Sequence, residues 1–113
     1  MTIGERLVGD VVVLDIKGEM SRYKGDSSAK KRVRELLDQG HLSLLLNLTH
    51  VPYMDSSGVG EIASSFITVR NHHGVLKIAG AQSPVRTLLA VAKLNTVIDV
   101  FDTEAEALDS FGA

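Results

Sequence analysis

Residues 42–48, LSLLLNL, constrain the fold more than any other stretch of this chain. The segment is short and almost wholly apolar, a pattern typical of a β-strand covered on both faces. Such strands lie inside sheets whose faces carry helices. We therefore predict a central strand, parallel to its neighbours, with Leu44, Leu46 and Leu48 buried against helices on one face.

The residues before this strand predict a hairpin and a helix. The run RLV, the pair Gly9-Asp10 and the run VVVLDI form a hairpin pattern, because glycine accepts the positive φ of a two-residue turn. The polar residues 21–28 suit a loop. One helical face follows, which Gly40 ends; its apolar members are Ala29, Val33, Leu36 and Leu37.

Helices and strands alternate after residue 50. A second helical face closes near residues 71–74, and its members are Val59, Ile62, Ala63, Phe66 and Val69. Residues 75–80 and 96–101 predict two more strands. Between them, Ser83 is placed as an N-cap and Pro84 in the first turn of a helix with Val85, Leu88, Leu89 and Ala92 on one face. Thr103 and Glu106 have capping-box spacing before Leu108 and Phe111.

This order predicts an α/β fold in which residues 1–113 form a single domain. An N-terminal β-hairpin joins a mostly parallel central sheet with about four helices. The length of 113 residues and the 44% hydrophobic content suit a compact core. The sequence contains no cysteine, which excludes disulfides and cysteine zinc sites.

The net charge and the first residues of the chain indicate which classes of partner and which location to expect. A formal charge of -2 gives no general attraction to nucleic acid or to an anionic membrane. The first residues, MTIGERLVGD, lack the apolar core of a signal peptide, and no apolar run approaches ~18 residues. We therefore expect a cytoplasmic protein with neither nucleic acid nor membrane as partner.

Residues 53–62, YMDSSGVGEI, place two serines between an acid and two glycines. A purely structural interpretation makes Ser56 or Ser57 the cap of a helix that starts near Gly58, with Asp55 adding a favourable charge. Glycines weaken a helix, so Gly58 and Gly60 need another reason. They would let another protein approach the backbone. A hydroxyl at this helix end could also carry a phosphate, stabilised by the dipole and by free N–H groups.

Enzyme motifs fit this segment poorly. GVGEIA matches the dinucleotide pattern G-x-G-x-x-A, but nine residues separate Leu48 from Gly58, and no acid follows about 20 positions later. No phosphate-binding loop is present, and Asp55 replaces the first glycine of a nucleophile elbow. Neighbouring side chains on a helix diverge by about 100°, so His72 and His73 are expected to close a helix rather than share a metal.

A basic cluster lies before the predicted central strand: Lys24, Lys30, Lys31, Arg32 and Arg34. Such runs commonly form the solvated face of a helix. A docking patch for an acidic partner is the alternative. A nucleic-acid site is disfavoured because Tyr23 is the one aromatic residue of the cluster and the whole chain is slightly acidic.

The segment LLLNLTHVPYMDSSGVGEI resembles the signature of anti-sigma factor antagonists, the small single-domain members of the STAS family. The resemblance extends over the N-terminal hairpin, Gly18-Glu19, the following helix and residues 74–108. It implies that the first serine of D-S-S-G, Ser56, is phosphorylated. It also implies a partner-binding surface, made of Met20, Ser21, Asp55, Ser56, Ser57, Gly58 and Val59.

The resemblance implies no catalytic site, metal or cofactor in the chain itself. The partner would be an anti-sigma factor with serine kinase activity, which supplies the ATP chemistry, and a serine phosphatase would remove the phosphate. The family pattern G-x-L-D is replaced here by Gly18-Glu19-Met20-Ser21. The resemblance implies that this loop lies near Ser56, so the replacement bears on partner choice. Two alternatives stay open: a STAS signalling module that does not act on a sigma factor, and a small hydrolase or nucleotide-binding domain that uses Ser56 or Ser57 chemically.

Overall fold

Five strands form one mixed sheet in the order β1-β2-β3-β4-β5. The computed structural model describes residues 1–22 and 28–112. β1 pairs antiparallel with β2, and every later pair is parallel. The strands are β1 (Thr2–Val8), β2 (Val11–Lys17), β3 (Ser43–His50), β4 (Val75–Ala79) and β5 (Val100–Phe101). β3 therefore lies at the centre between two parallel neighbours, as its leucine run predicted.

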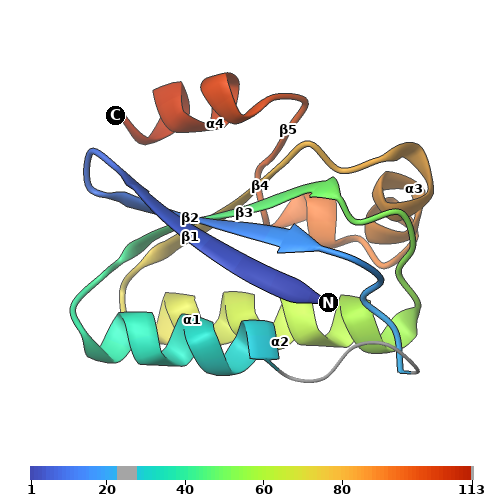
Figure 1. Cartoon of the computed structure of the whole chain (residues 1–113), viewed down its shortest axis with the longest axis horizontal. Helices are drawn as coiled ribbons and strands as arrows, with labels where there is room; N and C mark the ends of the chain where they lie inside the picture. The colour runs from blue at the N-terminus through green and yellow to red at the C-terminus, as the bar shows by residue number, and fades with distance from the viewer. Residues whose placement is uncertain (23–27, 113) are drawn as a thin grey trace.

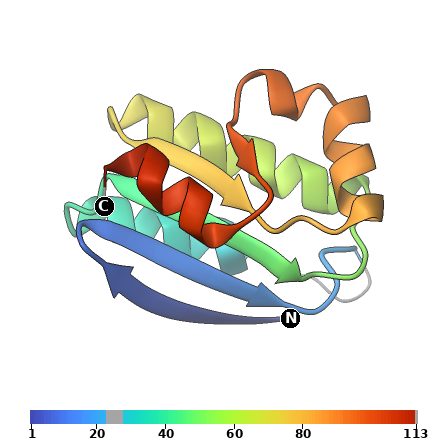
Figure 2. The ribbon, with the colours of Figure 1, turned by 90° about the horizontal axis from the view of Figure 1, so that it is seen from above.

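Helices cover both faces of the sheet. α1 (Ser28–Asp38) and α2 (Ser56–Asn71) lie side by side under one face, and α4 (Glu104–Phe111) lies over the other (Figure 1). α3 (Ser83–Val91) and the short 3₁₀ helix η1 (Leu94–Thr96) stand at the β4–β5 side, as the view from above shows (Figure 2). The predicted α/β class, the hairpin and the four α-helices are confirmed for the described residues.

The leucines of β3 divide between two apolar clusters, one on each face of the sheet. Leu44, Leu46 and Leu48 are at most 2% exposed and pack in the same cluster as α1 and α2. Leu45 points to the opposite face, where it packs with Ala107 of α4. Burying a leucine stabilises the fold by roughly 1.5–3 kcal/mol. A strand with four buried leucines therefore fixes which residues face each layer.

Two local predictions are confirmed in detail. Gly9 has a φ of 59° in the two-residue turn, where Val8 of β1 pairs with Val11 of β2. The buried residues of α1 are the four of the predicted face, and Gly40 follows the helix with a φ of 91°.

Three predictions near β5 are wrong in detail. The predicted strand 96–101 contains only Val100 and Phe101 as strand, because Thr96 closes a 3₁₀ turn in which its hydroxyl donates to the Lys93 carbonyl (2.6 Å). Ser83 is not the N-cap of α3 but its first residue. Gln82 holds the cap position, and its side chain instead donates to the Thr49 carbonyl (2.8 Å). Ala92, expected on the buried face, is exposed.

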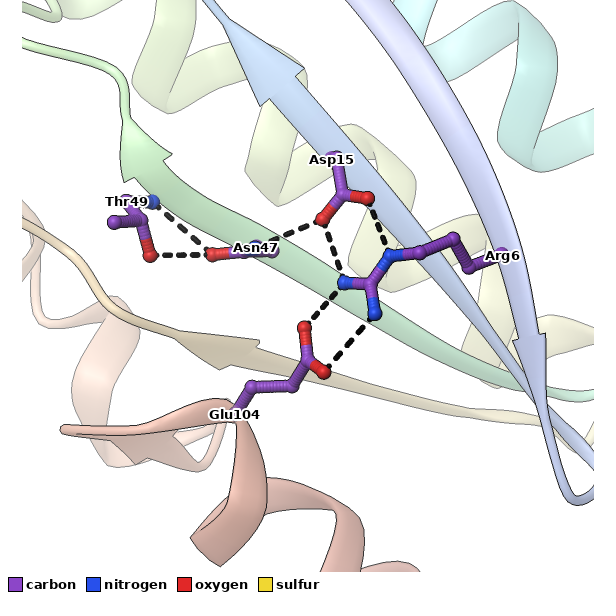
Figure 3. A network of polar contacts seen from close by, with 5 residues as sticks. All are labelled: Arg6, Asp15, Asn47, Thr49 and Glu104. Atoms are coloured by element: carbon purple, nitrogen blue, oxygen red, sulfur yellow. Dashed lines mark hydrogen bonds and ion pairs between the residues drawn. The ribbon is translucent and has the colours of Figure 1, made fainter.

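A polar network lies on the face of the sheet that α4 covers (Figure 3). Arg6 donates two hydrogen bonds to Asp15 (2.6 and 2.8 Å) and also contacts Glu104. Asn47 donates to Asp15 (2.8 Å) and accepts from the Thr49 hydroxyl (2.6 Å). The hydrogen bonds from Arg6, ahead of the one from Asn47, lower the pKa of Asp15. The network ties the hairpin, the central strand and α4 together; we call it the outer-face network.

Candidate functional site

The loops that follow β2 and β3 are held together by backbone hydrogen bonds. Gly18 N donates to His50 O (3.0 Å), and Met20 N donates to Tyr53 O (3.1 Å). Asp55 N donates back to Met20 O (3.2 Å), and Met20 forms an isolated parallel bridge with Met54. Both loops leave the carboxyl ends of parallel strands, where open α/β sheets place their binding sites. The expectation that the Met20–Ser21 loop lies near the serines is confirmed.

Asp55 caps α2, which corrects the structural interpretation of the serines. Its backbone is extended (φ -112°, ψ -170°), and its carboxylate accepts from Ser57 N (2.9 Å) and Gly58 N (3.4 Å). α2 therefore begins at Ser56, two residues earlier than predicted, and neither serine is the cap. Asp, Ser and Asn cap helices almost equally well, so residue type alone could not select among three neighbours.

The cap carboxylate also joins the two loops and stays ionised. Its second oxygen accepts from Arg22 N (3.1 Å). The hydrogen bond from the Ser57 hydroxyl, followed by that from Arg22 N, lowers the pKa of Asp55 to about 2. The N–H groups of Ser57 and Gly58 are thus already engaged by an anion. The expectation that they are free to stabilise a phosphate is wrong.

The two serines have different surroundings. The Ser57 hydroxyl donates to Asp55 Oδ1 at 2.6 Å, so it is part of the cap. Ser56 is exposed at the first position of α2, and it has no hydrogen-bond partner among the described residues. Of the two hydroxyls, only that of Ser56 is both exposed and unengaged.

The two glycines also differ. Gly58 is buried, and a Cβ atom there would overlap the Met20 carbonyl and lie 2.5 Å from Met54 Cγ. Its role is close packing against the neighbouring loop, so the idea that it opens the surface to a partner is wrong. Gly60 is exposed, and apart from its own neighbours in the α2 backbone no atom lies within 4 Å of its would-be Cβ. Gly60 alone fits that idea.

The other predicted partner-binding residues lie at different depths. Met20 and Ser21 are 1% and 3% exposed, so they support the site from below. Val59 is half-buried against the core of the α1–α2 face. Two exposed neighbours were missed by the sequence analysis, Tyr53 and Arg22. Tyr53 is 50% exposed. The sequence signal that was available for it was an aromatic residue two positions before Asp55.

The described residues do not have the geometry that a serine hydrolase or a nucleotide-binding domain needs. Gly58 and Gly60 lie inside α2 rather than in a turn directly after a strand, as dinucleotide binding requires. Hydrolysis by a serine needs a histidine within ~3 Å. In residues 1–22 and 28–112, which include every histidine, no hydrogen bond joins a histidine to either serine. His72 instead closes α2, with its Nδ1 2.9 Å from Thr68 O.

Two further features are absent from residues 1–22 and 28–112. No group of three or more acidic or histidine side chains is placed to hold a metal ion. No described helix combines the length and apolarity needed to cross a bilayer.

The basic cluster is divided by the structure. Lys30, Lys31 and Arg34 are exposed on α1. Arg32 is paired with Glu5 of β1 and lies 3.7 Å from Glu35, so it belongs to the fold rather than to a free patch. Lys24 lies outside the described residues.

Comparisons with known proteins agree with this geometry. An anti-sigma-B factor antagonist of Bacillus subtilis is 30% identical over 89 residues, which cover 79% of this chain and 80% of the relative. SpoIIAA, named as an anti-sigma factor antagonist and as a cell fate determinant of Bacillus, shares the fold in two forms. The unphosphorylated form has a TM-score of 0.74 at 20% identity, with 99% of each chain covered.

The phosphorylated form of SpoIIAA also has a TM-score of 0.74 at 20% identity and covers 97% of this chain and 99% of its own. These two likenesses show a common fold. The family model of the STAS domain matches residues 6–107. Because that match spans most of the sequence, the chain belongs to the STAS domain family.

Proposed function

We propose that this chain is an anti-sigma factor antagonist that is switched by phosphorylation of Ser56. It binds an anti-sigma factor with serine kinase activity, and the binding releases a sigma factor. The kinase then phosphorylates Ser56, which ends the binding, and a serine phosphatase restores it. Family membership and the names of the relatives support the role. The observation that carries the switch is the exposed, unengaged hydroxyl of Ser56 beside an engaged Asp55.

The physical effect of the switch is local charge. A phosphate adds roughly -1.5 to -2 charges. Asp55, with a pKa of about 2, already places one negative charge at the adjacent position. A partner docked over Ser56 would have to desolvate this combined charge or supply a cation for it, at a cost of several kcal/mol if it cannot. The Ser56 side chain is exposed, so the added phosphate can extend into solvent and the domain stays folded.

The other predicted partner-binding residues support this surface in different ways. Asp55, Ser57 and Gly58 hold the turn, while Met20 and Ser21 fix the neighbouring loop beneath it. The chain itself performs no catalysis in this proposal, because ATP is bound by the partner. It acts in the cytoplasm as one domain over residues 1–113, without cofactor, nucleic acid or membrane.

A second candidate is a STAS module of another kinase–phosphatase pair. The observation that favours it is the departure from G-x-L-D at Met20 and Ser21, because this loop is hydrogen-bonded to Asp55 and Tyr53. A changed loop here would select a different partner while the Ser56 switch is retained.

The test begins with a pull-down from the source cell, using unmodified protein and the Ser56→Asp variant as baits. We expect a serine kinase that binds a sigma factor in the unmodified bait and at least tenfold less of it with the variant. The purified kinase and ATP should then phosphorylate the chain, and mass spectrometry should place the phosphate on Ser56.

Two substitutions separate the serines. Ser56→Ala should bind the kinase but accept no phosphate, whereas Ser57→Ala should stay a substrate. Aspartate carries less charge than a phosphate, so the phosphorylated protein itself is the final titrant. Phosphate on Ser57, or undiminished affinity of the phosphorylated protein, would refute the switch. A captured kinase without a sigma factor would favour the second candidate.

A further inference from the structure

The cations of this chain are concentrated in one segment. Half of the 12 lysines and arginines lie within residues 22–34, and Asp26 is the one acid there among the 14 of the chain. The whole chain nevertheless carries a formal charge of -2. The surface near this segment must therefore differ strongly in potential from the rest of the molecule.

The described parts of this segment, Arg22 and the start of α1, lie near the first two turns of α2. Arg22 N donates to the Asp55 carboxylate (3.1 Å), one residue before Ser56. At the start of α1, Lys30 N donates to Glu61 of α2 (3.1 Å), so the first turn of α1 lies against the second turn of α2. Among the described residues of this segment, the exposed cationic side chains are Arg22, Lys30, Lys31 and Arg34, which we call the basic face.

The cations of the basic face form no ion pair within residues 1–22 and 28–112. Among the described residues, none of the four side chains is within 4.0 Å of a carboxylate. Arg32, between Lys31 and Arg34 in sequence, contrasts with them because it is paired with Glu5. The acids nearest to Ser56 already have partners: Asp55 holds the cap, and Glu61 accepts from Lys30 N. The basic face thus carries positive charge that nothing within the described chain neutralises.

We propose that the basic face is the docking surface for an acidic segment of the protein partner, and that Ser56 lies at its edge. The inference rests on the proposed function for the identity of that partner. It adds that the docking segment of the partner is acidic. An acidic segment is attracted by the unpaired cations and passes over the open surface at Gly60. A phosphate on Ser56 repels the same segment and competes with it for Arg22. Charge complementarity therefore explains both the binding and its loss on phosphorylation.

The inference can be tested without the proposed kinase partner. A decaglutamate peptide serves as the acidic probe and is titrated into isotope-labelled protein at about 50 mM salt, with amide shifts as readout. We expect the largest shifts at the basic face and at Gly60, and we expect them to fade at about 300 mM salt because exposed charges are screened. The Lys31→Glu/Arg34→Glu variant should lose at least tenfold in affinity, and Ser56→Asp about threefold.

Arg70→Glu is the matched control, because Arg70 is exposed on α2 about 20 Å along the helix axis from Ser56. It should retain affinity within about twofold. Equal loss with Arg70→Glu, shifts centred elsewhere, or no binding of the peptide would overturn the inference.

Phosphatidylserine vesicles and a DNA duplex are run beside the peptide, and tighter binding to either would replace the protein partner with a membrane or nucleic acid. Binding of the peptide at the basic face would support this inference even if the pull-down finds no kinase that binds a sigma factor. The inference and the proposed function can therefore fail independently of each other. With a kinase in hand, Lys31→Glu/Arg34→Glu should weaken its binding by more than threefold.

Discussion

The outer-face network and the first turn of α2 are both built around an aspartate, yet they leave different groups exposed. Asp15 accepts from Arg6 and Asn47, and each polar side chain of that network has a partner. Asp55 accepts from Ser57, Gly58 and Arg22, but the adjacent hydroxyl of Ser56 has none among the described residues. The first arrangement joins parts of the fold. The second holds one group ready for chemistry from outside.

The difference shows that one short motif can serve two purposes. In residues 55–60, Asp55 and Ser57 hold the turn through their hydrogen bonds, and Gly58 packs against the Met20 loop. Ser56 and Gly60 face solvent. A substitution in this motif should therefore act either on stability or on partner binding, and the predictions below test that division.

Gly58→Ala should have the largest effect on stability. Its Cβ would overlap the Met20 carbonyl, and a backbone atom cannot move away as a flexible side chain can. Overpacking of this kind costs about 2–3 kcal/mol, which lowers the unfolding temperature by about 10 °C in a domain of this size. Thermal unfolding followed by circular dichroism measures it.

Gly60→Ala is the matched control for Gly58→Ala. Apart from its own neighbours in the α2 backbone, no atom lies within 4 Å of its Cβ position, and alanine favours a helix over glycine by up to ~1 kcal/mol. The variant should be as stable as the wild type or more stable. Equal destabilisation by both alanines would show that Gly58 acts through helix propensity rather than packing.

Arg6→Met should have the second largest effect, a loss of roughly 1–1.5 kcal/mol. Arg6 contacts both Asp15 and Glu104. The Asp15 side chain is only 18% exposed, so the substitution would leave a largely buried carboxylate without its cationic partner. The carboxyl pKa of Asp15 is lowered in the fold, so this stabilisation exists above the unfolded pKa of about 3.9 and fades as the pH falls. Urea unfolding at pH 7 and pH 3 should therefore show a smaller difference between variant and wild type at pH 3.

Arg86→Met is the control for Arg6→Met. Arg86 pairs with a single carboxylate, Asp102, and the two side chains are 45% and 71% exposed. Removing such a pair should change the free energy of unfolding by less than about 0.5 kcal/mol. A loss as large as that of Arg6→Met would mean that the outer-face network is no stronger than an isolated surface pair.

Asp55→Asn should change the pH dependence of stability more than the stability at neutral pH. Asparagine is an equally good N-cap, but its amide nitrogen cannot accept from Arg22 N, so the unfolding temperature near pH 7 should fall only slightly. The folded pKa of Asp55 is about 2, below the unfolded value of about 3.9. Its contribution is therefore present above pH 4 and is lost as the pH falls from 4 towards 2. Unfolding temperatures across that range should fall less steeply for Asp55→Asn, and parallel curves would contradict the cap assignment.

How far the sequence could predict the fold depended on how local each signal is. Leu44, Leu46 and Leu48 predicted the central strand, and all four buried residues of α1 were predicted. In both segments the apolar residues recur with the period of the element itself, so the signal is local. The start of the chain's last strand, β5, was not predictable in this way. Thr96 joined a 3₁₀ turn through its hydroxyl, which competed with the strand pattern.

The details of the site depended on contacts between distant residues. Gly58 is required by Met20, which lies 38 positions earlier, and no pattern within the motif reveals that contact. The choice of Asp55 over either serine as the cap follows from the hydrogen bond between Asp55 N and Met20 O, which sets the backbone where α2 begins. The resemblance singled out Ser56, and the structure added the reason that distinguishes it from Ser57.

Ser56→Ala should have the smallest effect on stability, and comparison with Ser57→Ala tests the division most sharply. The Ser56 hydroxyl has no hydrogen-bond partner within residues 1–22 and 28–112, so the free energy of unfolding of the variant should stay within about 0.3 kcal/mol of the wild type. Ser57→Ala removes the 2.6 Å hydrogen bond to Asp55 and should cost about 0.5–1 kcal/mol. It should also raise the pKa of Asp55, since that bond is the main cause of its lowering. Carboxyl titration by NMR measures the second effect: a raised Asp55 pKa in Ser56→Ala instead would show that Ser56, not Ser57, belongs to the cap.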